Sequence, residues 1–115
     1  IVLTTDDHAE GSGLRLLDLD GQFLRTIAAG QFRKPEAVTA SHGRAFVVDD
    51  CDDDDDESCK VLHVIDIQSG DIIQRVRVDL YGGIVSAVLV DGDEIYIASF
   101  GASKVVVLRY AGSEV

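Results

Sequence analysis

The sequence predicts an all-β fold of antiparallel strands, and two observations predict it. The first is composition: 46% of the 115 residues are hydrophobic, with no Met, no Trp and a single Pro. A core of Val, Ile, Leu and Ala suits pleated sheets. The second is repetition, because segments of similar strand and turn character recur three times along the chain. No segment shows the i, i+3, i+4 apolar spacing that a helix of about ten residues needs.

The first repeat covers residues 1–29. Its Gly- and Ser-rich loop at 8–13 and its Asp20-Gly21 pair predict two connections between strands. We therefore expect strands at residues 1–6, 14–19 and 22–28.

The second repeat, residues 30–79, begins with Pro35, which fixes the entry to its first strand. His42-Gly43 and Ser69-Gly70 predict turns. We expect strands at residues 36–40, 44–49, 60–67 and 72–78.

The third repeat covers residues 80–115, and Asp91-Gly92 predicts its tight turn. We expect strands at residues 84–90, 94–99 and 104–110. The segment 84–90 is apolar or small on both sides, which is typical of a strand packed between neighbouring sheets. The segment 72–78 alternates instead, which indicates a half-solvated outer strand.

The spacing of the repeats predicts the architecture. IVLTTDD begins at position 1, RAFVVDD at 44 and EIYIASF at 94, giving steps of 43 and 50. The longer step contains an acidic insertion. A period in the low forties with four strands per repeat is typical of a β-propeller blade. A β-sandwich, which also has short strands at even spacing, is the rival interpretation. The chain is thus predicted to be a single propeller segment, residues 1–115, with blades at 1–29, 30–79 and 80–115.

Two stretches resemble known propeller repeats. KVLHVIDIQSGDIIQRVRV (60–78) resembles the YVTN repeat, in which a Val-Ile-Asp strand and a Ser/Thr-Gly turn precede an outer strand. GQFRKPEAVTASHGRAFVVDD (30–50) resembles the NHL repeat, with Gly and Phe before Pro and an apolar strand ending in Asp. The third repeat departs from the pattern, since it has no Pro at its entry and Ser99 replaces the Asp of the other two repeats.

The number of blades poses a physical problem. The repeats make about two and a half blades, whereas closed propellers use about four to eight. Uncovered blade faces and strand edges favour aggregation. Two solutions follow: the chain is a segment of a longer propeller, or identical chains close a ring by cyclic symmetry.

The charge of the chain is concentrated in one place. Of the net charge of −11, eight acidic groups are Asp49, Asp50, Asp52 to Asp56 and Glu57, and −11 + 8 leaves −3 for the rest. A nucleic-acid partner is excluded because no cationic stripe exists. No apolar run reaches the roughly 20 residues of a membrane-spanning helix.

Cys51 and Cys59 flank the acidic run, and we expect them to lie close together across a hairpin tip. A disulfide between them would pin a self-repelling loop and indicate a secreted protein, extracellular or lumenal. Two free thiols are the alternative. Zinc binding is disfavoured because no pair of His residues lies nearby.

The acidic run also suggests weak Ca²⁺ binding through Asp52, Asp54 and Asp56, since hard cations bind carboxylate oxygens. The run lacks the Gly and the terminal Glu of a calcium loop, so a solvated repulsive loop or a docking site for a basic partner are the alternatives. No other cofactor is predicted.

Catalytic residues are not predicted. His8, His42 and His63 occupy different positions of the repeat, and His63, between apolar neighbours, is expected to be a hydrogen-bonded, partly buried residue. The chain has no Gly-rich phosphate loop and no Gly-x-Ser-x-Gly motif. The resemblance implies that metal-binding or catalytic groups of related enzymes lie near the central channel, where this chain offers Glu36 and Thr39.

Three functions are compatible with these features. The leading hypothesis is a non-catalytic propeller module that acts as a scaffold for protein recognition. The alternatives are a fragment of a larger propeller hydrolase or lyase whose active residues lie outside this chain, and a structural subunit of a multi-chain assembly. The expected partners are other proteins, further copies of the chain or the remaining blades.

Overall fold

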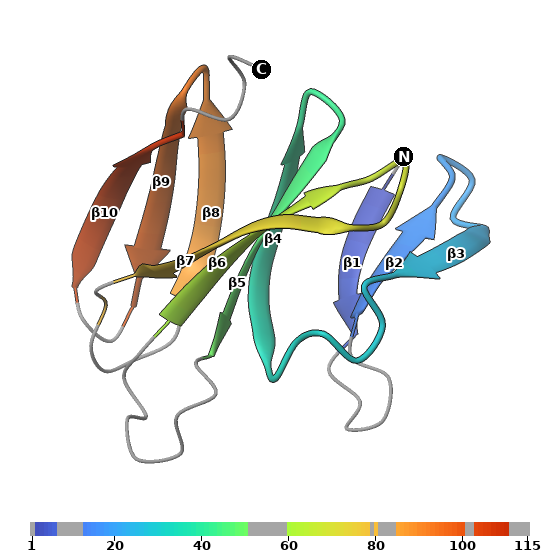
Figure 1. The fold of residues 1–115 in the computed structure, drawn as a ribbon, viewed down its shortest axis with the longest axis horizontal. Helices are drawn as coiled ribbons and strands as arrows, with labels where there is room; N and C mark the ends of the chain where they lie inside the picture. Colours follow the sequence, from blue (N-terminus) through green and yellow to red (C-terminus); the bar gives the residue numbers. More distant parts are fainter. Residues whose placement is uncertain are drawn as a thin grey trace.

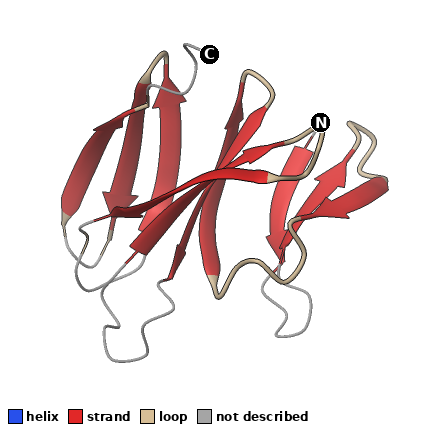
Figure 2. Cartoon of the chain, in the orientation of Figure 1, coloured by secondary structure: helices blue, strands red, loops and turns tan. Residues whose placement is uncertain are grey.

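The computed structural model of the protein describes residues 13–50, 60–78, 80, 85–100 and 103–110, and the backbone of residues 2–6. This part of the chain consists of strands, turns and loops without a helix (Figure 2). Its strands are β1 (Val2–Asp6), β2 (Gly13–Leu17), β3 (Phe23–Ile27), β4 (Pro35–Ser41), β5 (Arg44–Asp50), β6 (Lys60–Asp66), β7 (Ile72–Val78), β8 (Val85–Asp91), β9 (Glu94–Ser99) and β10 (Lys104–Arg109). The predicted strands have the same ends as these to within two residues.

These strands form three sheets, each built from strands that follow one another in the chain (Figure 1). The first sheet has the order β1-β2-β3, the second β4-β5-β6-β7 and the third β8-β9-β10. All of their neighbouring strands are antiparallel. The predicted all-β fold with antiparallel sheets is therefore confirmed.

Glycines with positive φ stand at the four turns that the sequence predicts. Gly21, Gly43, Gly70 and Gly92 have φ angles of 84°, 77°, 80° and 62°. In the β4–β5 hairpin His42 also has a positive φ, of 53°. Two consecutive residues of this kind match the right-handed twist of the strands that they join. The turn chemistry therefore sets the strand order locally.

The first and second sheets share two features, a β-bulge and an Asp that caps the following turn. A β-bulge lies at Leu16/Leu17 in the first sheet and at Val64/Ile65 in the second. Just after each bulge, an Asp side chain accepts hydrogen bonds from the backbone of the following turn. Asp18 accepts from the N–H groups of residues 20 and 22, and Asp66 from those of residues 68 and 69. The β2–β3 and β6–β7 hairpins are thus built alike.

Two apolar clusters hold the sheets together. Between the first and second sheets, the buried members are Leu14, Leu16, Ile27, Phe32, Ala45, Val47 and Ile65. Between the second and third sheets, they are Phe46, Val48, Leu62, Val64, Val78, Leu80, Val85, Val88, Ile95, Ile97 and Tyr110. Because side chains alternate across a strand, β5 supplies both clusters from its two faces. The second sheet is therefore the central layer of the molecule.

The three sheets are also connected along one side. β4 lies against both β1 and β8, so the first strands of the three sheets lie next to one another in series (Figure 1). The Arg25 guanidinium on β3 donates hydrogen bonds to the carbonyl oxygens of Ile67 and Gln68 in the turn of the second sheet. Contact between sheets thus involves both the apolar clusters and the backbone of a turn.

One expectation requires correction. The segment 84–90 was expected to pack on both sides, yet in β8 only one face is covered. Val85 and Val88 are buried against the second sheet, whereas Leu89 is 60% exposed. The reason is the position of the third sheet at the end of the stack, where no described element covers its second face. By contrast, β7 has the mixed burial that its alternating sequence predicts.

Candidate functional site

The residues that the sequence suggests for a metal site or a disulfide lie outside the part of the chain that the structure describes. Cys51, Cys59, Asp52, Asp54 and Asp56 lie in the segment 51–59, outside the described residues. The disulfide and the weak Ca²⁺ site therefore stay predictions. Among the residues that the structure describes, no group of three or more His, Cys, Asp or Glu side chains could hold one metal ion.

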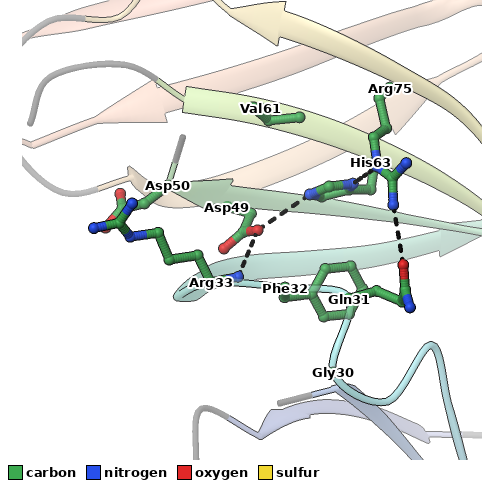
Figure 3. Close-up of a pocket in the computed structure, with 9 residues that line it drawn as sticks. All are labelled: Gly30, Gln31, Phe32, Arg33, Asp49, Asp50, Val61, His63 and Arg75. Atoms are coloured by element: carbon green, nitrogen blue, oxygen red, sulfur yellow. Dashed lines mark hydrogen bonds and ion pairs between the residues drawn. The ribbon is translucent and has the colours of Figure 1, made fainter. Parts of the chain in front are cut away.

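A polar cleft opens where β5 ends and β6 begins. It has a volume of about 600 Å³ and lies between the second sheet and the loop that leads from the first sheet (Figure 3). Its lining consists of Gly30, Gln31, Phe32, Arg33, Asp49, Asp50, Val61, His63 and Arg75. Because it combines buried ionisable groups with a concave shape, this cleft is a candidate location for a functional site.

Asp49 is the central acceptor of the cleft. Its carboxylate accepts hydrogen bonds from the backbone N–H groups of Arg33 (2.9 Å) and Lys34 (2.6 Å), and it contacts His63 Nε2 at 3.1 Å. The residue is 2% exposed. Since Asp49 is the penultimate residue of β5 and Lys34 precedes β4, this carboxylate fastens the entering loop to the sheet. A buried acceptor of this kind stabilises only if its donors stay in place.

His63 is hydrogen-bonded through both ring nitrogens. Arg75 Nε donates to His63 Nδ1 at 3.3 Å. Because a guanidinium is only a donor, Nδ1 must be an acceptor, so that Nε2 carries the proton and donates to Asp49. The ring packs edge-on against Phe32, with centroids 5.0 Å apart. The expectation of a hydrogen-bonded histidine is confirmed, and the residue is more deeply buried than expected, with an exposure of only 4%.

Arg75 closes the cleft on the side of β7. Besides its bond to His63, its guanidinium donates to Gln31 Oε1 at 3.2 Å (Figure 3). The chain of contacts therefore runs from Gln31 in the loop, through Arg75 and His63, to Asp49 and back to the loop. Each member ties a strand of the second sheet to the segment that precedes β4.

A second polar network lies close by and reaches the third sheet. Lys60 Nζ donates to Glu36 Oε1 and to Asp50 Oδ1, both at 2.6 Å. The other oxygen of Glu36 accepts from the backbone N–H of Val85 at 2.6 Å. The Lys60 and Glu36 side chains are only 4% and 7% exposed. This triad joins β4, β5 and β6 to the first residue of β8.

Burial by itself would lower the pKa of Lys60. The hydrogen bonds from its ammonium to Asp50 and Glu36, and the charges of these two carboxylates, outweigh burial and raise the pKa above its ordinary value. Lys60 is therefore held in its charged form, and it serves as the counterion of the two carboxylates.

The sequence indicates Glu36 only as a residue near the central channel, and it does not reveal that Glu36 binds Lys60 and the backbone of Val85. Lys60 carried one recognisable signal, because it stands three positions after the last acidic residue, Glu57, and opens an apolar strand. A Lys at the start of a buried strand needs a carboxylate partner. Asp49 was noted as the strand-ending Asp of the motif, but its backbone donors lie 15 and 16 positions earlier in the chain.

The polar groups of the cleft are therefore bonded to one another and to the backbone. Figure 3 shows the bonds from Asp49, His63 and Arg75 running between strands and loop. Among the described residues, no buried side-chain nitrogen or oxygen is without a hydrogen-bond partner. Chemically, this arrangement holds a loop against a sheet.

The third sheet has an exposed apolar face. Successive side chains of a strand point to opposite faces of the sheet. In the third sheet, one set of alternate residues packs in the cluster against the second sheet, so the other set points away from it. We call this surface the outer face of the third sheet; it carries Ala87, Leu89, Tyr96, Ala98, Val105 and Val107. The pairing register places Leu89, Tyr96 and Val107 in one row across the strands, and Ala87, Ala98 and Val105 in another. Val105, Leu89 and Val107 are 63%, 60% and 50% exposed.

The first sheet also has a face turned away from the second. Leu14, Leu16 and Ile27 point into the core, so among the described side chains the outer face of the first sheet carries Arg15, Leu17, Phe23 and Thr26. Phe23 is 51% exposed, and the Arg15 guanidinium lies over its ring at 4.9 Å from the centroid. Apolar side chains are therefore exposed at both ends of the stack.

The described chain is an all-β protein in which three antiparallel sheets are joined by apolar clusters and buried polar networks. Comparisons with protein-family models, with curated proteins and with solved structures found no match to this chain. In the part of the chain that the structure describes, there is no helix that could cross a membrane.

Proposed function

We propose that this chain is a segment of a β-propeller and that it acts as a non-catalytic scaffold for protein interactions. The succession of antiparallel sheets in chain order, packed face to face with β1, β4 and β8 in series, supports the propeller. The similar hairpins of the first and second sheets support a common repeat. A sandwich would instead pair two sheets around one core.

The NHL-like resemblance gains a physical basis from the cleft. Phe32, Pro35 and Asp49 carry the motif in the sequence, and all three act at the same place in the fold. Phe32 is buried beside His63, Pro35 begins β4, and Asp49 binds the backbone just before Pro35. These contacts support a repeat whose motif residues fasten each entering loop.

The observation that carries the interaction function is the outer face of the third sheet. Contiguous exposed apolar side chains on a soluble domain mark surfaces that bind other proteins. The buried ionisable groups support a scaffold rather than a catalyst, because His63, Asp49 and Lys60 are each used to join elements of the fold.

A photo-crosslinking experiment tests this function. A photoreactive benzoylphenylalanine at position 89, on the outer face, should form covalent adducts with protein in cells that express the full chain. The same residue at position 73 is the matched control, because Ile73 is 46% exposed but lies on β7 of the second sheet. Equal yields of protein adducts at the two positions would refute the interaction function.

A structural subunit of a multi-chain assembly is the second candidate. The presence of apolar outer faces at both ends of the stack favours it, since a monomer would leave both exposed to water.

A further inference from the structure

The outer face of the third sheet corresponds position by position to a buried face of the second sheet. In the second sheet, register pairs Phe46 with Val64 and Val48 with Leu62. The third sheet has the matching pairs Tyr96 with Val107 and Ala98 with Val105. The four residues of the second sheet are at most 2% exposed, because the third sheet covers them. The outer face is therefore built like a surface that another sheet covers.

The outer face of the first sheet corresponds to the other face of the second sheet, the one that packs against the first sheet. Next to its bulge, the register pairs Leu17 with Phe23, as it pairs Ile65 with Ile72 next to the equivalent bulge of the second sheet. Ile65 is fully buried against the first sheet, and Ile72 packs against the same cluster. Phe23 has the same place in its hairpin but is half exposed.

From this correspondence, we propose that the two outer faces are the two halves of one sheet–sheet interface, and that a second copy of this chain supplies the partner half. The outer face of the third sheet of one copy would pack on the outer face of the first sheet of the next. This inference rests on the proposed scaffold function, and it adds the identity of the partner and the polarity of the contact.

The correspondence also predicts the symmetry of the contact. The two faces have different residues, so the interface is head-to-tail, and a head-to-tail contact forms either a closed ring or a filament. Each copy contributes three sheets, so two copies bring twice three sheets. That number falls within the range of about four to eight blades in closed propellers. A ring of two copies would cover both outer faces of each copy.

Mixing two variants tests the polarity. Val105→Lys with Val107→Lys places charges on the outer face of the third sheet, whereas Phe23→Glu places one on the outer face of the first. The lysine variant keeps the outer face of the first sheet intact, and the Phe23→Glu variant keeps that of the third sheet. These two intact faces can bind only to each other. Alone, each should stay at the mass of one chain. In an equimolar mixture, native mass spectrometry should detect a complex of one copy of each.

The substituted residues are at least half exposed, so the sheets should still form, and circular dichroism checks that they do. Ile73→Lys is the control for an added charge on an exposed strand, and it should associate like the unmodified chain. Self-association of either variant alone would indicate that two identical outer faces contact each other, and it would overturn the proposal. Failure of the mixture to form the complex would overturn it as well. If adducts form at position 89 with other proteins only, the scaffold function survives and the second copy is excluded as the partner.

Discussion

Asp49 shows how a charged side chain is stabilised inside this small domain. Its carboxylate has three donors, two from the backbone before β4 and one from His63. Charged acceptors form stronger hydrogen bonds than neutral ones, and an unpaired buried charge is strongly destabilising. Asp49 therefore links the loop to the sheet only as long as all of its partners are in place.

Asp49→Asn should destabilise the protein by about 1–3 kcal/mol, because the amide replaces an ionised acceptor and turns one donor towards the backbone N–H groups. The measurement is the free energy of unfolding in urea. Asp71→Asn is the matched control, since Asp71 is exposed in a turn. If both variants unfold at the same urea concentration, the fastening role of Asp49 is wrong.

Lys60→Met should destabilise the protein by about 3 kcal/mol near neutral pH, because it leaves the buried carboxylate of Glu36 and the partly exposed carboxylate of Asp50 without their counterion. The folded pKa of Lys60 is raised, so its contribution is complete below the unfolded value of 10.5 and is lost as pH rises through the folded value. The stability difference between the unmodified chain and the variant should therefore shrink above pH 10.5.

Urea unfolding at a series of alkaline pH values measures this difference. Lys104→Met provides the control, because Lys104 is exposed at the start of β10. A difference that stays constant through the alkaline range would show that the ammonium of Lys60 is not held by the triad.

The sequence contained only part of this information at the residue scale. The apolar neighbours of His63 in its strand predict that its side chain is hydrogen-bonded. The partners of Asp49 and Lys60 come from sheet pairing and from a loop far along the chain, and one register shift would have changed them. Hydrogen bonds that cross between elements cannot be read from local pattern alone.

At the scale of elements, turn residues determine most of the strand positions. Each predicted Gly turn has a positive φ, and strand ends agree with the prediction to within two residues. The bulges at Leu16/Leu17 and Val64/Ile65 could not be predicted, since a bulge depends on how two strands pair. The exposed side of β8 was missed because sequence shows an apolar surface but not what covers it.

Gly43→Ala should destabilise the protein by about 1–2 kcal/mol, because an L-residue with a β-carbon is strained in the left-handed region. An added Cβ would meet no atom within 4 Å, so the effect would come from the backbone alone. Gly43→Asn should lose less, since Asn tolerates this conformation. Thermal unfolding ranks the three proteins, and a ranking with Asn below Ala would contradict the turn geometry.

At the scale of the whole molecule, the three sheets form a stack in which the middle sheet is buried on both faces and each end sheet on one face. In the described part of the chain, the second sheet is covered on both faces, while the first and third each have a face that no described element covers, with exposed Phe23 at one end and Val105 at the other. The sequence predicted this problem from the count of repeats. The structure adds which side chains are exposed and how they correspond to buried positions, and these define the proposed interface.

The molar mass of the unmodified chain in solution, measured by light scattering over a dilution series, tests the central claim most directly. Two complementary outer faces on each copy predict a defined species at twice the chain mass of 12.4 kDa. Because each copy in a closed ring makes two contacts, this mass should persist on dilution. A well-folded chain at 12.4 kDa throughout the series would contradict the claim that a second copy covers the outer faces.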